Sequence, residues 1–106
     1  MFQFDHIGIT TTEKKKNEFY YEPNKVWITD SESHPFHIEW LRYEPDTPVT
    51  DAVRTRPHIG YRVDNLKEVN IKGLNLILRP MVIDAHKIVA FYEYIDGSII
   101  ELIEVH

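Results

Sequence analysis

Apolar and polar residues alternate over short runs along most of this chain, a pattern typical of β-strands. The runs are rich in Ile, Val, Phe, Tyr and Trp, and turn residues such as Gly, Pro and Asp separate them. The pattern predicts strands over residues 1–10, 25–30, 36–43, 57–63, 75–83, 86–95 and 98–105.

Two stretches favour short helices between the strands. Residues 11–21 (TTEKKKNEFYY) start with threonines that can cap a helix, and Pro23 follows their end. Residues 64–73 (DNLKEVNIKG) offer Asp64 or Asn65 as a cap and end in glycine. Each predicted helix follows a predicted strand.

Two further segments are predicted to connect strands. Asp96-Gly97 separates two strong strand runs and predicts a hairpin turn, because Gly tolerates positive φ. The polar residues 46–55 predict a linker or a surface crossover. The order strand, short helix and further strands is therefore found twice, as an internal repeat on the scale of half the chain.

The repeat extends to the type of residue. Each half opens with His-Ile-Gly, at His6 and His58, and carries Ile-Glu in its last strand, at Glu39 and Glu101. The histidine and the glutamate are ten residues closer in the first half. We therefore expect the first half to be trimmed, by a short helix or a missing strand.

Side-chain alternation predicts which residues share a face of each strand. In both histidine strands the glycine two positions later, Gly8 or Gly60, shares the face of the histidine and leaves space for a ligand. Both glutamates lie in mid-strand among apolar residues, where a buried carboxylate needs a partner. A divalent cation shared by the two imidazoles and the two carboxylates would supply it.

Two His and two Glu form a mixed nitrogen and oxygen donor set, which suits Zn, Ni, Co, Mn or Fe(II) better than Ca or Mg. On an octahedral ion they would leave two positions for water or substrate oxygens. The chain has no cysteine, which excludes thiolate metal sites and disulfides. The alternative interpretation is that the histidines are ordinary hydrogen-bonded strand residues and the glutamates face solvent.

Composition narrows the class of function. At 106 residues we expect one domain, and a net charge of −5 disfavours nucleic-acid binding. Residues 14–16 (KKK) form the one basic run, which we interpret as a solvated helix face. The N-terminal residues do not resemble a signal peptide, and no apolar run is long enough for a membrane span. We expect a cytoplasmic protein that does not bind membranes.

The chain resembles the vicinal oxygen chelate superfamily, which includes glyoxalase I, methylmalonyl-CoA epimerase, extradiol dioxygenases and the fosfomycin and bleomycin resistance proteins. The resemblance lies in residues 4–10 (FDHIGIT), 38–46 (IEWLRYEPD), 57–66 (PHIGYRVDNL) and 89–104 (VAFYEYIDGSIIELIE). It implies an α+β fold in one domain, residues 1–106. Two βαβββ modules, 1–46 (trimmed) and 56–106, would form a curved mixed sheet around a cavity.

The resemblance also implies a metal site and a reaction. Carried over residue by residue, it implies four metal ligands: His6, Glu39, His58 and Glu101. Family members chelate a substrate through adjacent oxygens, which implies a lyase or isomerase that stabilises an enediolate. Glu101 or Glu39 would be the general base. Arg62 would hold a substrate carboxylate, and Tyr43 is a weaker candidate for substrate binding.

Two other functions remain open. A metal-free protein that binds an antibiotic-like small molecule would need apolar cavity walls, for which four aromatic residues are available: Trp27, Trp40, Phe91 and Tyr92. An Fe(II) dioxygenase needs two His and one carboxylate, so a fourth ligand at Glu39 counts against it. An exposed sheet edge in a trimmed module would favour a homodimer.

Overall fold

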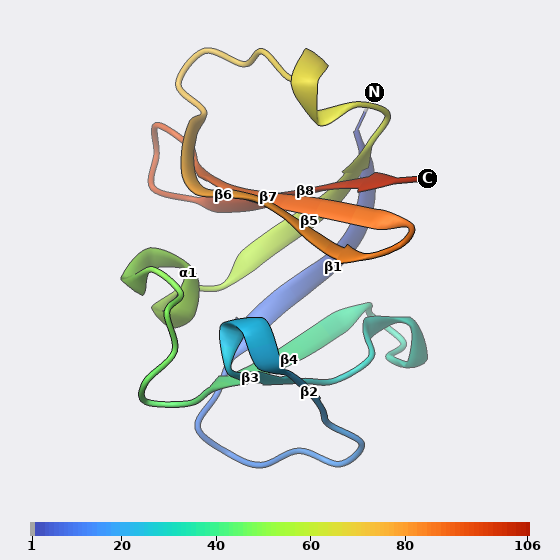
Figure 1. The fold of residues 1–106 in the computed structure, drawn as a ribbon, viewed down its shortest axis with the longest axis vertical. Helices are drawn as coiled ribbons and strands as arrows, with labels where there is room; N and C mark the ends of the chain where they lie inside the picture. Colours follow the sequence, from blue (N-terminus) through green and yellow to red (C-terminus); the bar gives the residue numbers. More distant parts are fainter. Residues whose placement is uncertain (1) are drawn as a thin grey trace. The chain divides into compact units, whose positions relative to one another are not determined.

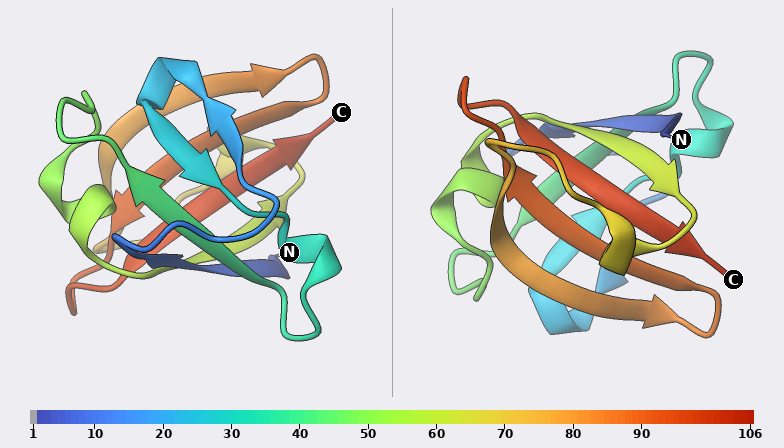
Figure 2. Two further views of the ribbon diagram at one scale, coloured as in Figure 1. Left: turned by 90° about the horizontal axis from the view of Figure 1, so that it is seen from below. Right: turned by 90° about the horizontal axis from the view of Figure 1, so that it is seen from above.

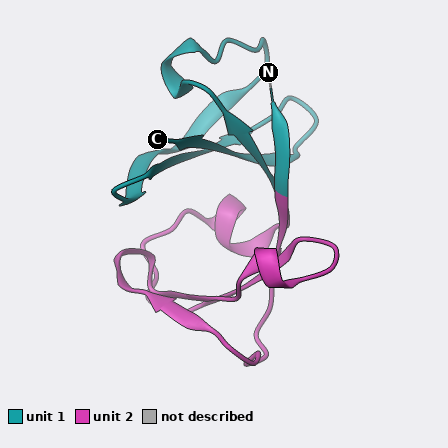
Figure 3. Cartoon of the chain, turned by 90° about the vertical axis from the view of Figure 1, so that its right-hand side faces the viewer, with its two compact units in different colours: residues 1–5, 58–106 teal, residues 6–57 magenta. Residues whose placement is uncertain are grey.

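The computed structural model describes residues 2–106 and consists mainly of β-strands (Figure 1). The chain divides into two compact units (Figure 3). Unit 1 comprises residues 1–5 and 58–106, and unit 2 comprises residues 6–57. The division falls inside strand β1 (Gln3–Thr10), so both units include part of this strand.

Unit 2 contains most of β1 together with three further strands. These are β2 (Phe19–Tyr21), β3 (Val26–Ile28) and β4 (Ile38–Tyr43). The strands are arranged in the order β2-β3-β4-β1. β1 pairs with β4 in parallel, and β3 is antiparallel to both β2 and β4.

Unit 1 repeats this connectivity. Its strands are β5 (His58–Val63), β6 (Asn75–Asp84), β7 (Lys87–Glu93) and β8 (Ile99–Val105). They are arranged in the order β6-β7-β8-β5, with β5 and β8 parallel and the other pairs antiparallel. In sheet order the strands read β2-β3-β4-β1-β5-β8-β7-β6. The half-chain repeat and the mixed sheet are therefore confirmed.

The difference in length between the repeats lies in their middle strands. β2 and β3 have 3 residues each, whereas β6 has 10 and β7 has 7. No strand of the first repeat is missing, so its shortening is one of strand length. β6 bends along its course, which gives the sheet of unit 1 its curvature (Figure 2). Register shifts against β7 fall along the bent strand, on both sides of Pro80.

The helix predicted over residues 11–21 is wrong. The Thr11 hydroxyl accepts a hydrogen bond from the Glu13 amide, which makes a local turn, and no helix follows. Asn17 has φ +62°, which is incompatible with a continuing helix. The aromatic residues after it pair with β3 as β2. Three consecutive lysines give this segment no apolar stripe with which a helix could pack.

The second predicted helix is reduced to one 3-10 turn, η3 (Leu66–Glu68), which Asn65 caps by accepting a hydrogen bond from the Lys67 amide. Two other 3-10 turns, η1 (Glu22–Asn24) and η2 (Ser31–Ser33), lie in unit 2. The predicted mixed sheet is thus observed, whereas the helices that the α+β class with βαβββ modules implies are reduced to short turns.

The polar segment 46–55 differs from a simple linker. It contains α1 (Asp51–Thr55), and it buries Val49 and Val53, which are 6% and 1% exposed. These valines join Val26 and Leu41 in the apolar core of unit 2. None of the helices among the described residues is long and apolar enough to cross a membrane.

The non-helical segment before β2 contacts one face of β4 through two cationic side chains, one from the segment and one from β4. The Lys15 ammonium lies 4.3 Å from the ring centroid of Trp40. Arg42 donates from Nε and Nη2 to the two carboxylate oxygens of Glu18, at 3.0 and 2.8 Å. Hydrogen bonding to Arg42 holds the pKa of the Glu18 carboxyl below its ordinary value.

The predicted hairpin between β7 and β8 is confirmed. Gly97 has φ +89°, and the Asp96 carboxylate accepts a hydrogen bond from the Ser98 amide at 3.0 Å. This hairpin provides most of the apolar core of unit 1. Its buried residues are Val89, Ala90, Phe91, Ile99, Leu102 and Ile103.

Candidate metal centre

In unit 1, the side chains of His58 and Glu101 contact each other from neighbouring parallel strands. The Nε2 atom of His58 lies 3.1 Å from Oε1 of Glu101. The histidine side chain is 1% exposed and the glutamate side chain 10%. Gly60 is the register partner of Glu101, and alternation puts the side chain of His58 on the face of Gly60. The predicted common face of these residues is therefore observed.

In unit 2, His6 and Glu39 form the equivalent pair. The Nε2 atom of His6 lies 3.6 Å from Oε1 of Glu39, and the side chains are 4% and 20% exposed. Gly8 is the register partner of Glu39 on parallel strands. The His6–Glu39 pair is thus longer and more accessible than the His58–Glu101 pair.

The two pairs match residue for residue in the sheet register. Ile7 is opposite Ile38 as Ile59 is opposite Ile100, and one position later each glycine is opposite its glutamate. The glycine has no side chain at the point where the glutamate of the next strand must reach the histidine. The repeated His-Ile-Gly therefore marks a repeated His–Glu arrangement, which the sequence predicts from spacing and parity.

The burial of these side chains bears on whether they suit a metal ion. His6, His58 and Glu101 are buried, at 3%, 2% and 8% exposed. Two imidazoles and one carboxylate are a set of side chains that could hold a metal ion. Imidazole nitrogen and carboxylate oxygen suit a first-row transition metal or zinc, as the sequence predicts, and a buried carboxylate is stabilised by positive charge.

Phe91 contacts His58, and the sequence analysis did not predict this contact. Its ring centroid is 5.1 Å from that of His58, with an interplanar angle of 88°. It is also the register partner of Glu101 on β7. The sequence contains a signal for their pairing. Phe91 lies five residues before Asp96 in the hairpin turn, and Glu101 lies five residues after it, so the two residues face each other across the hairpin.

The strand of unit 2 that corresponds to β7 is too short to place a residue beside Glu39. β3 ends at Ile28, which pairs with Leu41, and Asp30 lies beyond the end of the strand. The Asp30 carboxylate accepts hydrogen bonds from the amide of Glu32 and the hydroxyl of Ser33, and so caps η2. The two pairs therefore consist of the same types of residue in different surroundings.

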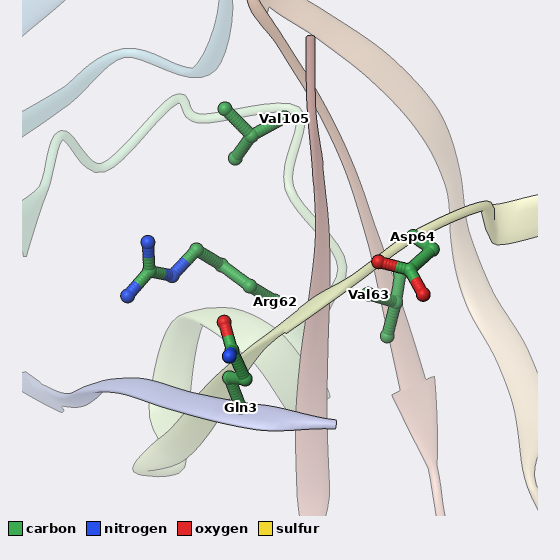
Figure 4. Close-up of a pocket in the computed structure, with 5 residues that line it drawn as sticks. All are labelled: Gln3, Arg62, Val63, Asp64 and Val105. Atoms are coloured by element: carbon green, nitrogen blue, oxygen red, sulfur yellow. The ribbon is translucent and has the colours of Figure 1, made fainter. Parts of the chain in front are cut away.

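Arg62, the predicted substrate-binding residue, lies at the other end of β5 from His58. Its Nε is 3.3 Å from Oδ1 of Asp5, and its side chain is 52% exposed. It lines an open pocket of about 430 Å³, and Figure 4 shows its guanidinium extended beside Gln3. The lining residues are Gln3, Arg62, Val63, Asp64 and Val105, so the pocket does not include the histidine of β5. A role for Arg62 toward a substrate stays a prediction.

The other residues predicted to bind a substrate or to line a cavity do not lie together. Tyr43 ends β4, four residues beyond Glu39, and its register partner is Val26. Trp27 stacks on Tyr20, with ring centroids 4.8 Å apart, and Trp27 is the register partner of Arg42, on the face of β4 opposite Glu39. Of the four aromatic residues proposed as cavity walls, Phe91 contacts a proposed ligand.

Comparison with known proteins adds no assignment, so the functional argument rests on these residues and their geometry. Neither a protein-family model nor a curated protein matches the chain.

Proposed function

We propose that this protein is a metal-dependent lyase or isomerase of the glyoxalase or epimerase type. One divalent ion would be bound by His6, Glu39, His58 and Glu101. The observation that carries the proposal is the repeated register, which gives each unit one histidine and one glutamate in contact. A single His–Glu pair offers two ligands, whereas two pairs complete the four that a stable transition-metal site uses.

The ligands fit a reaction at a carbon next to a carbonyl group. A divalent ion held by these residues would supply Lewis acidity toward two adjacent substrate oxygens. The chain must provide the base, and we assign this role to Glu39. Its side chain is twice as exposed as that of Glu101 and lies farther from its histidine, at 3.6 Å against 3.1 Å. Glu39 would take the proton from the substrate carbon and return it.

Deuterium exchange tests the proposed reaction. Protein purified without a histidine tag and loaded with Zn²⁺, Co²⁺ or Ni²⁺ is incubated in D₂O with dihydroxyacetone or lactaldehyde, which carry adjacent oxygens. NMR should detect deuterium at the carbon next to the carbonyl, and the exchange should stop after treatment with EDTA. Bound metal without any metal-dependent exchange would contradict the proposed reaction and favour a binding protein.

A further inference from the structure

Phe91 is the residue of β7 that lies against the proposed metal ligands of unit 1. It is 6% exposed, and its ring meets the His58 ring at an interplanar angle of 88°. It is also the register partner of Glu101. One buried ring is thus placed against both members of the His58–Glu101 pair.

The geometry limits the rotation of the imidazole. A histidine ring rotates broadly about χ2 unless its surroundings fix it. The perpendicular phenyl ring occupies space that the imidazole would sweep through, and Glu101 faces its Nε2 atom at 3.1 Å. A phenyl ring also excludes water, which strengthens the electrostatic interaction between the imidazole and the carboxylate.

The histidine–glutamate contact differs between the units. In unit 2, β3 ends at Ile28 before it reaches the level of Glu39, and there the histidine and the glutamate are 3.6 Å apart with the glutamate more exposed. In unit 1, with Phe91, they are 3.1 Å apart. The closer contact thus occurs in the unit that has an aromatic ring at the level of the glutamate.

We propose that Phe91 is a positioning residue that holds His58 in one orientation and tautomer, so that the His58–Glu101 pair is preorganised as the anchoring half of the metal site. The proposal rests on the proposed function for its metal. Its first consequence concerns the imidazole alone and can be measured without metal. Removing a residue that orients a metal-binding histidine commonly weakens metal affinity by about 10-fold to 100-fold.

The test uses Phe91→Leu, which keeps an apolar side chain and removes the ring plane. Tyr92→Leu is the matched control, because Tyr92 is the next residue of β7 and points to the opposite face. Phe91→Tyr keeps the ring and should behave like the wild type. Thermal unfolding confirms that each variant is folded, and if Phe91→Leu does not fold, Phe91→Met takes its place under the same criteria.

Two measurements decide the outcome. In metal-free protein, the imidazole ¹⁵N shifts of His58 should show one tautomer in the wild type and in Tyr92→Leu, and a mixture in Phe91→Leu. Titration with Co²⁺ should give an affinity about 10-fold weaker for Phe91→Leu alone. An unchanged tautomer in Phe91→Leu, or equal effects of the two leucine variants, would overturn the proposal. If no protein binds Co²⁺, the proposed function fails, and the ¹⁵N measurement still decides the role of Phe91.

Discussion

The Nε2 atom of His58 lies 3.1 Å from Oε1 of Glu101, and both residues are buried. A buried carboxylate beside an imidazole is costly unless positive charge or further hydrogen bonds compensate it. Glu101 is flanked in sequence by isoleucine and leucine and could be apolar if packing were its sole role. The pair is therefore the part of the molecule whose alteration should have the clearest consequence.

Replacement of His58 by alanine should abolish binding of Zn²⁺, because it removes the most buried of the proposed ligands. We expect a loss of at least 100-fold in affinity, measured by isothermal titration. His86→Ala is the matched control, since His86 is exposed in the turn between β6 and β7 and is not a proposed ligand. Equal affinity of His58→Ala and the wild type would remove the proposed site.

The two glutamates should differ when each is replaced by glutamine, which keeps the shape and removes the charge. Glu101→Gln should weaken Zn²⁺ binding by 10-fold or more, because Glu101 belongs to the closer and more buried pair. Glu39→Gln should retain more of the metal affinity and lose the deuterium exchange, because Glu39 is the proposed base. The reverse pattern would assign the base to Glu101.

The strands could be predicted from the sequence because their signal is local. β1, β5 and β8 are rich in β-branched and aromatic residues, and the turn at Gly97 fixes the register of β8 against β7. The match between the repeats followed from His-Ile-Gly and Ile-Glu alone. The helix over residues 11–21 was mispredicted because cap residues and charge do not form a helix without an apolar face, and Asn17 adopts positive φ.

Contacts between strands were harder to predict than the strands. Alternation predicted Arg62 on the face of His58, and it could not indicate that Asp5 binds the guanidinium. It also could not indicate that Phe91, a predicted cavity-wall residue, lies against His58, because that contact depends on the pairing of β7 with β8. The two His–Glu pairs could thus be predicted as residue types in a pattern, whereas their surroundings depend on tertiary pairing.

Glu18 should make the stability of the protein depend on pH. Its folded-state pKa is lowered by hydrogen bonding to Arg42, so its stabilising contribution is present above the unfolded-state pKa and is lost as pH falls through the folded-state value. Glu18→Gln should lower the stability at pH 7 by about 1 kcal/mol. The difference from the wild type should shrink below about pH 4.5. Thermal unfolding between pH 7 and pH 3 measures this.

Glu13→Gln provides the control for that series. The Glu13 side chain is 74% exposed, and its carboxylate lies 3.9 Å from the Lys15 ammonium. Its replacement should leave the melting temperature nearly unchanged across the pH range. If Glu13→Gln and Glu18→Gln gave the same pH profile, the bidentate contact with Arg42 would not stabilise the fold.

Two glycines with positive φ should differ in their tolerance of a side chain. Gly97→Ala should destabilise the protein by about 1–2 kcal/mol through backbone strain alone, because no other group lies within 4 Å of the added Cβ. Gly73→Ala imposes the same strain at φ +88° and places its Cβ 3.2 Å from Cβ of Ile95. It should cost more in urea denaturation. A smaller cost at Gly73 would mean that the loop around Ile95 yields readily.

The number of ions bound per chain tests the central claim most directly. Protein purified without a tag is loaded with Zn²⁺, desalted and analysed by plasma mass spectrometry beside His6→Ala and His58→Ala. One shared site predicts one equivalent for the wild type and less than a tenth for each variant. Two equivalents, with one retained in each variant, would mean that the pairs bind ions separately, and less than a tenth in the wild type would mean that the protein has no metal site.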